Sequence, residues 1–118
     1  ANAYFTRAEI KNIRRDYCGA IEDYSLVIRY NNKDSHAYYN RGLLKLTAES
    51  DYRGALADAQ AAVRLDPGYA AAFCLMGIAR YHLGDRKGAC KDYRRAEALD
   101  PESCIFGGDE GILKDCPR

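Results

Sequence analysis

Few side chains in this sequence have both the type and the spacing that catalysis or metal binding requires. The two histidines are His36 and His82, so a cysteine–histidine site would have to combine His82 with Cys74 or Cys90. On one helix, Cys74 and His82 would lie roughly 12 Å apart at about 1.5 Å per residue, too far for a shared metal ion. Phosphate-loop, dinucleotide-binding, zinc-protease and nucleophile-elbow motifs are all missing from the sequence. We therefore predict a non-enzymatic chain with no catalytic residues, no metal site and no cofactor.

The acidic residues and the cysteines have simpler structural explanations. Asp16, Asp51 and Asp85 each precede a helical pattern, where a carboxylate caps the helix and stabilises its dipole. The five cysteines form no C-x-x-C pair, and their odd number favours free thiols that pack as small apolar residues. Free thiols indicate a reducing compartment, so we expect a cytoplasmic location; a pairing of the two most C-terminal cysteines is left open. The cysteines are Cys18, Cys74, Cys90, Cys104 and Cys116.

Composition allows one globular domain and argues against several kinds of partner. The 118 residues are 47% hydrophobic and 30% charged, with a net charge of +1. Basic and acidic residues are balanced along the chain as well, so we expect no nucleic-acid binding and no direct contact with a membrane. No apolar run is long enough to span a bilayer. Because the chain begins at Ala1 and its one methionine is Met76, we expect a fragment or a processed chain.

The sequence repeats itself with a period of 34 or 35 residues, which predicts the architecture. Three similar segments contain a Gly-Ala pair followed three residues later by Asp: they are residues 16–24, 51–59 and 85–93. Upstream of them stand Ala-Tyr-Phe, Ala-Tyr-Tyr and Ala-Phe-Cys, and Leu-Asp-Pro occurs twice, 34 residues apart. The offsets place one extra residue between Gly42 and Asp51. Repeats of this length are typical of stacked helix pairs.

Each repeat is predicted to form two antiparallel helices. In the third, helices are expected over residues 70–83 and 86–99, with Gly84 as a left-handed stop and Asp85 as the cap of the second helix. The second helix places Ala89, Tyr93 and Ala96 on one stripe. Small residues on both helices would let the pair approach closely. They are Ala8, Gly42 and Gly77 in the first helices, and Ala20, Ala55 and Ala89 in the second ones.

This pattern resembles the tetratricopeptide repeat (TPR) family. The family's opening aromatic is matched by Tyr4, Tyr38 and Phe73, and its proline by Pro67 and Pro101, whereas the first repeat has Asn32 in place of proline. The resemblance implies an all-α, right-handed α-solenoid of three TPR helix hairpins. The expected units are residues 1–34, 35–68 and 69–103. Residues 104–118 are expected to form a C-terminal tail with a short capping helix that carries Ile112 and Leu113.

The resemblance also implies where a partner would bind. In the family, a second stripe on the first helix of each hairpin lines a concave groove, and in this sequence that stripe is largely apolar and aromatic. We expect the Asn40 amide to bond to the backbone of a ligand. The expected groove residues are Phe5, His36, Tyr39, Asn40, Leu43, Leu46, Cys74, Ile78, Tyr81 and His82.

Two interpretations of this stripe remain open. It accepts a peptide or helix of another protein, or it is already covered by the tail, by a further repeat or by a second copy of the chain. Family members that bind chaperone tails clamp a terminal carboxylate with five residues, of which only Asn40 is matched here. The other four positions hold Phe5, Glu9, Ala71 and Leu75, so acidic chaperone tails are not expected to bind.

The sequence therefore predicts a non-catalytic protein–protein interaction module or scaffold. The first alternative is a homo-oligomerisation module within a larger assembly. A helical-repeat RNA binder is a further alternative, against which the balanced charge argues.

Overall fold

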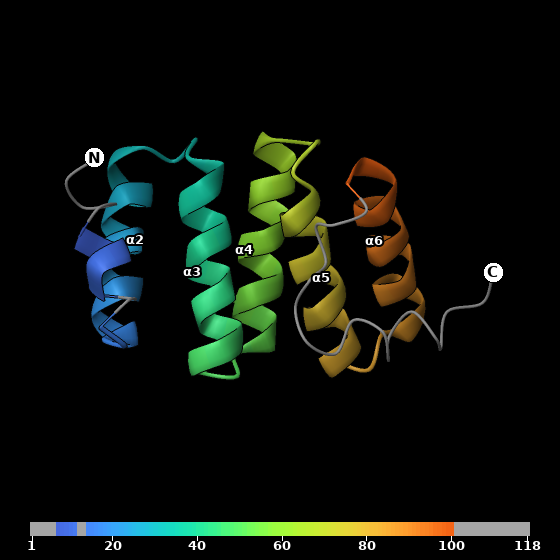
Figure 1. Cartoon of the computed structure of the whole chain (residues 1–118), viewed down its shortest axis with the longest axis horizontal. Coiled ribbons are helices and arrows are strands. Elements are labelled where there is room, and N and C mark those ends of the chain that lie inside the picture. Colours follow the sequence, from blue (N-terminus) through green and yellow to red (C-terminus); the bar gives the residue numbers. More distant parts are fainter. Residues whose placement is uncertain (1–6, 12–13, 101–118) are drawn as a thin grey trace.

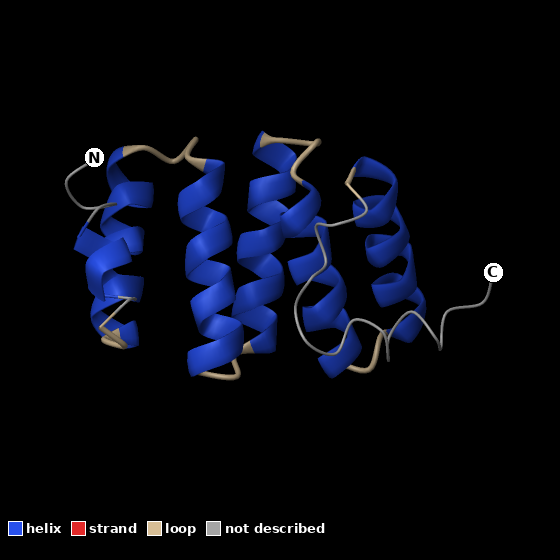
Figure 2. Ribbon diagram, in the orientation of Figure 1, coloured by secondary structure: helices blue, strands red, loops and turns tan. Residues whose placement is uncertain are grey.

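The computed structural model describes residues 7–11 and 14–100, and these residues form helices joined by short loops (Figure 2). After a helical segment at residues 7–11 come α2 (Tyr17–Tyr30), α3 (Ser35–Ala48), α4 (Tyr52–Leu65), α5 (Ala70–His82) and α6 (Arg86–Leu99). No strand occurs within the described part of the chain. The predicted all-α class is confirmed. Phe5, Cys104, Cys116 and the expected capping helix with Ile112 and Leu113 lie outside the described residues.

The helices stand side by side in chain order, so the molecule is elongated, with extents of 44 × 25 × 22 Å (Figure 1). Each helix packs against the next one, and α3 also contacts α5 across the repeat boundary. The connections are too short for any other arrangement, because adjacent helices joined by a few residues must run antiparallel. This is the stacked-hairpin solenoid that the period predicts.

Aspartate side chains begin most of these helices, as predicted. Asp16, Asp51 and Asp85 accept hydrogen bonds from the backbone N–H groups of Gly19, Gly54 and Gly88, three residues further on. Asp34 caps α3 in the same way through the N–H of Ala37. The Tyr69 side chain, in contrast, makes no capping hydrogen bond at the start of α5.

A residue in the left-handed backbone conformation follows the first helix of each repeat. Gly84 has φ of +91°, and Ser50 and Arg15 have φ of +51° and +63° at the matching turns. The extra residue of the second repeat lies at this point: α3 has 14 residues and α5 has 13. The turn after α3 is accordingly wider, with the N–H of Asp51 donating to the carbonyl of Lys45 six residues back.

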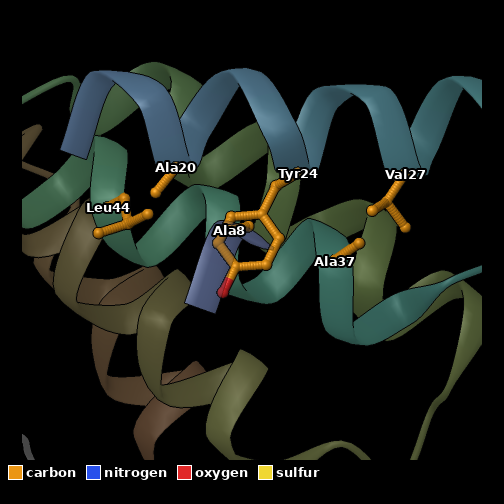
Figure 3. Packing of buried hydrophobic residues seen from close by; sticks show 6 residues of the cluster. All are labelled: Ala8, Ala20, Tyr24, Val27, Ala37 and Leu44. Carbon is orange, nitrogen blue, oxygen red and sulfur yellow. The ribbon is translucent and has the colours of Figure 1, made fainter. Parts of the chain in front are cut away.

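Small side chains allow the helices to approach closely. All of the predicted alanines at these contacts are fully buried, including Ala8, Ala20, Ala55 and Ala89. In the first repeat they surround Tyr24, whose ring fills the space between α2 and the residue 7–11 helix, with Leu44 of α3 nearby (Figure 3). The core is therefore divided into small clusters, one at each place where two helices meet.

One buried aspartate in each repeat joins the two helices of the hairpin. In the second repeat, Arg41 donates to both carboxylate oxygens of Asp58 at 2.9 and 2.7 Å, and the Lys45 ammonium lies 3.4 Å from Asp58. The first repeat has the same arrangement of Arg7 and Lys11 around Asp23. The third differs, since one cation, Arg80, contacts Asp92. Helical periodicity alone does not predict these charged clusters.

Candidate functional site

The first helices of the second and third repeats carry most of the residues predicted to form a partner-binding groove. On α3 these are His36, Tyr39, Asn40, Leu43 and Leu46, and on α5 they are Cys74, Ile78, Tyr81 and His82. The two histidines are exposed and Cys74 is fully buried, whereas the other six are half-buried. Since α3 and α5 contact each other, the structure brings two of the three predicted rows of side chains close together.

An aromatic cluster connects these two helices at the N-terminal end of α5. The Tyr69 hydroxyl and the Nδ1 atom of His36 are 2.9 Å apart, and the centre of the Tyr69 ring lies 5.1 Å from the centre of the Tyr39 ring. Burial raises the pKa of both Tyr39 and Tyr69, so their hydroxyl groups stay protonated near neutral pH. The cluster therefore offers aromatic surface and neutral hydrogen-bonding groups. Tyr69 was not among the predicted site residues because it precedes the helical pattern.

The middle of the predicted row contributes to the core as well as to the surface. Tyr39, Leu43 and Leu46 pack against a cluster of Ala59, Leu75 and Met76. These contacts join α3 to α4 and α5 and hold the second repeat against the third. A substitution of Leu43 would therefore disturb packing between repeats together with any binding at this surface.

The C-terminal part of the row is also aromatic. Ile78 and Tyr81 pack against Ala89 and Tyr93 of α6. The His82 ring is stacked on Tyr52 of α4, with ring centres 4.4 Å apart and ring planes 9° apart. Each histidine thus contacts a tyrosine from another part of the fold: His36 contacts Tyr69, just before α5, and His82 contacts Tyr52 of α4. The described residues contain no group of three or more potential metal ligands.

Asn40 differs from its neighbours on α3. Its side chain is half-buried, and it forms no hydrogen bond with any of the described residues. Next to it in sequence, the Arg41 guanidinium is held by Asp58 and Ser25. An amide at a half-buried position, with both donors and an acceptor unused by the described chain, is a suitable group to pair with a ligand backbone.

Cys74 requires a correction. It is fully buried and disulfide-bonded, so its side chain is not accessible to a partner, and Cys90 is also disulfide-bonded. The prediction of free thiols is therefore wrong for these two residues and is confirmed for Cys18, which is free and exposed. The expectation of a reducing compartment loses its main support, since it depended on free cysteines. Sequence alone gives no pairing for five cysteines.

No described helix has the length and apolar character needed to cross a lipid bilayer.

Comparison with known proteins identifies the fold. The second TPR domain of Spaghetti, solved with the HSP90 peptide SRMEEVD bound, superposes with a TM-score of 0.80 at 28% identity, over 83% of this chain and 90% of that one. The chain has the tetratricopeptide-repeat fold. No protein-family model matches the chain. The three helix pairs described above are therefore TPR hairpins, as the sequence resemblance implied.

Curated relatives include an Hsp70-Hsp90 organizing protein and a heat shock protein. The Hsp70-Hsp90 organizing protein of Triticum aestivum is 35% identical over 69 residues, which is 58% of this chain and 12% of that protein. The heat shock protein STI1 of Saccharomyces cerevisiae is 27% identical over 100 residues, or 85% of this chain and 17% of that protein. The chain thus spans less than a fifth of the length of these relatives.

Proposed function

We propose that this TPR domain is a non-catalytic protein-interaction module whose α3–α5 surface binds a peptide or helix of a partner protein. The observation that carries the proposal is the row of half-buried aromatic and apolar side chains on α3 and α5, with the Asn40 amide among them. Such a row offers apolar burial for affinity and one polar group that fixes the direction of an extended ligand. The peptide-bound Spaghetti domain supports the proposal by fold.

The chemistry of this surface favours an apolar ligand over an acidic chaperone tail. At the positions where the family clamps a carboxylate, the described residues are Glu9, Asn40, Ala71 and Leu75, none of them a cation. Leu75 is fully buried and therefore contributes to packing between repeats. These four positions therefore offer no positive charge to a terminal carboxylate, and the half-buried Tyr39 and Tyr69 nearby, whose pKa values are raised, stay neutral. We expect the ligand to provide leucine-like and aromatic side chains.

The proposal is tested by selecting binders from a displayed library of random peptides and measuring their affinity by fluorescence anisotropy. Asn40→Ala should weaken the selected peptides by about tenfold, the effect of losing about one hydrogen bond. Asn32→Ala, at an exposed turn, is the matched control and should leave affinity unchanged. The peptide SRMEEVD should bind more weakly than the selected peptides.

Amide chemical shifts of the labelled protein provide the second readout. Selected peptides should shift the resonances of α3 and α5, including those of Tyr39, Asn40 and Ile78. Equal loss of affinity in Asn40→Ala and Asn32→Ala, or shifts confined to α2, α4 and α6, would show that the proposed surface is wrong.

Self-association is the second candidate function, and one observation favours it. The last residue of each second helix is a large exposed side chain: Tyr30, Leu65 and Leu99 are 67%, 41% and 45% exposed. A row of exposed apolar and aromatic side chains along one edge of a solenoid is suited to pack against a second copy of the chain. Light scattering over a dilution series tests this: the mass of a dimer that decreases on dilution supports self-association, and a monomer mass throughout removes it.

A further inference from the structure

The second helices of the three repeats differ on the face that points toward the following repeat. In α2 this face carries Tyr17, Ile21 and Ile28, which pack against the cluster that contains Leu44 of α3. In α4 the matching residues Leu56 and Val63 pack against Leu75 and Met76 of α5. The apolar stripe on each of these two helices is thus used to bind the next hairpin.

In α6 three of the four matching positions are charged. Arg86, Cys90, Arg94 and Glu97 stand at the positions of Tyr52, Leu56, Gln60 and Val63 in α4. Arginine side chains at these positions make a fourth hairpin of the same kind a poor fit, because packing there would bury unpaired charge. The outer face of α6 is therefore suited to a charged partner rather than to a further hairpin.

Arg86 and Arg94, with further basic residues, surround a hollow of about 760 Å³ beside α5 and α6. Five of its lining residues are basic, and the one acidic residue, Asp85, already accepts a hydrogen bond from the N–H of Gly88. The hollow is lined by Arg80, Asp85, Arg86, Lys87, Gly88, Cys90, Lys91 and Arg94. Its volume lies within the range of known ligand pockets, about 300–1,000 Å³.

Two of the basic residues make contacts within the fold, and three are exposed without a described ion-pair partner. Arg80 pairs with Asp92, and the Arg86 guanidinium lies over the Tyr81 ring, 5.8 Å from its centre. Lys87, Lys91 and Arg94 are exposed and form no ion pair with a described carboxylate. The numbers of basic and acidic residues are balanced in the sequence, so this cluster cannot be recognised there. In the structure Asp92 is buried and paired with Arg80, which leaves the nearby cations on the surface.

We propose that this α6 basic surface, formed by Arg86, Lys87, Lys91 and Arg94, binds an acidic segment of a partner protein. Carboxylates are the natural counterpart of clustered guanidinium and ammonium groups, and the aliphatic stems of these side chains add apolar contact. Residues 86–94 span roughly 12 Å of helix, which matches about four residues of extended chain. The surface borders the α3–α5 row at Tyr81, over which Arg86 lies, but Lys87, Lys91 and Arg94 belong to α6 and form no hydrogen bond or ion pair with the described residues of that row. The proposal is therefore tested through Lys91 and Arg94, separately from the proposed function.

An acidic protein segment fits this surface better than nucleic acid does. The proposed site gathers five basic residues around one hollow of limited volume, and the whole chain has a net charge of +1. Binding to a phosphate backbone depends on many cations along a track, more than the few gathered at this hollow. A short acidic peptide needs only the few charges that are clustered here.

The test uses a fluorescein-labelled peptide, Glu-Glu-Leu-Glu-Glu-Leu, its Gln-for-Glu counterpart and a labelled oligothymidine, each titrated with the full chain. The glutamate peptide should bind, and the glutamine peptide should bind at least about tenfold more weakly. Lys91→Glu combined with Arg94→Glu should weaken binding of the glutamate peptide by at least about tenfold. Arg53→Glu combined with Arg64→Glu reverses the same number of charges on exposed positions of α4 and is the matched control.

Each other outcome overturns the proposal. No binding of the glutamate peptide, equal binding of the glutamine peptide, or an equal loss in the α4 control would show that the α6 basic surface is not a specific acidic-peptide site. Tighter binding of the oligothymidine that is lost in the α6 variant would assign the surface to nucleic acid instead. Circular dichroism of both double variants confirms that exposed substitutions leave the helices intact.

Discussion

At the scale of single residues, the three repeats place a buried aspartate in two different electrostatic environments. The hydrogen bond from Arg7 lowers the pKa of Asp23 against the opposing effect of burial, and Lys11 adds to this effect. For Asp92, burial outweighs the attraction of Arg80 and raises the pKa to about 6. The same carboxylate position is therefore charged in one repeat and titrates near neutral pH in another.

The difference between the repeats is explained by one residue. The position that holds Arg7 and Arg41 in the first two repeats is occupied by Met76 in the third. Met76 is buried and belongs to the apolar cluster with Leu75, so among the described residues Asp92 pairs with one cation where its counterparts pair with two.

Restoring the second cation should lower the pKa of Asp92. We predict that Met76→Lys brings this pKa from about 6 toward its ordinary value of 3.8, because the ammonium group would stabilise the carboxylate. Carboxyl-carbon NMR titration measures the change, and Met76→Leu is the control that keeps the site apolar. A pKa that remains near 6 in Met76→Lys would show that burial alone sets it.

Asp92 should also make stability depend on pH in an unusual direction. Its pKa is higher in the folded chain than in the unfolded one, so the folded state binds more protons between about pH 4 and 6. The stabilisation by this group is present below that window and is lost as the pH rises through 6. We predict that the urea midpoint decreases from pH 5 to pH 7 in the wild type, and decreases less in Asp92→Asn.

Asp23 serves as the internal control for this effect. Its pKa is lowered, so its contribution is present at neutral pH and is lost only as the pH falls below about 4. The two aspartates thus act in separate pH windows. Identical midpoint changes in the wild type and Asp92→Asn would mean that another group causes the dependence.

At the scale of helices, the hairpins depend on glycines at the crossing points. A Cβ atom on Gly77 would lie 2.8 Å from two ring carbons of Tyr93 and 3.2 Å from the carbonyl oxygen of Ala89. Gly42 is in a similar position against Asp58 and Ala55. Since Tyr93 is only 1% exposed, its ring has little space to move away.

We predict that Gly77→Ala destabilises the fold although alanine favours helices. Overpacking costs typically about 1–3 kcal/mol, against a helix-propensity gain of about 1 kcal/mol. Gly68→Ala is the control, since its added Cβ would lie 3.7 Å from Asp66, an ordinary contact. Urea unfolding should show a lower midpoint for Gly77→Ala alone; equal midpoints would mean that α5 and α6 can separate without cost.

The repeat pattern allowed most helices to be predicted closely. The second helix of the third repeat matches its predicted bounds of 86–99, and the first ends at His82, one residue before the predicted bound. The predicted extra residue is confirmed by the longer α3. Periodicity succeeds here because every hairpin must bury the same stripe against its neighbour.

The interactions between helices were harder to predict. Asp58 recurs in register with Asp23 and Asp92, but only the arrangement of the helices shows that Arg41 can reach it from the opposite helix. A polar residue that recurs on an otherwise buried stripe was the available signal. No comparable signal in the sequence indicates that Cys74 is disulfide-bonded, because the spacing of cysteines does not determine their pairing. Tyr69 lies in the turn before α5, where helical periodicity makes no prediction about side-chain position.

At the scale of the whole molecule, the linear stacking of helices determines how stability is distributed. The cluster of Ala59, Leu75 and Met76 joins α3, α4 and α5, whereas α6 packs mainly on α5 within the described part of the chain. In such arrays each hairpin is stabilised mainly by its neighbours, so the centre is protected from both sides. A partner bound across α3 and α5 would therefore act on the most stable part of the solenoid.

Amide hydrogen exchange should reveal this difference in stability between the centre and the ends of the array. We predict that amides in the middle of α4 exchange most slowly and those of α2 and α6 faster, because end hairpins open without disturbing the centre. Leu75→Ala removes a fully buried side chain between the second and third repeats and should speed exchange in α3 to α6. Val27→Ala, fully buried in the first cluster, should act mainly on α2 and α3. Uniform exchange rates in the wild type, with both variants accelerating every helix equally, would mean that the three hairpins unfold as a single cooperative unit.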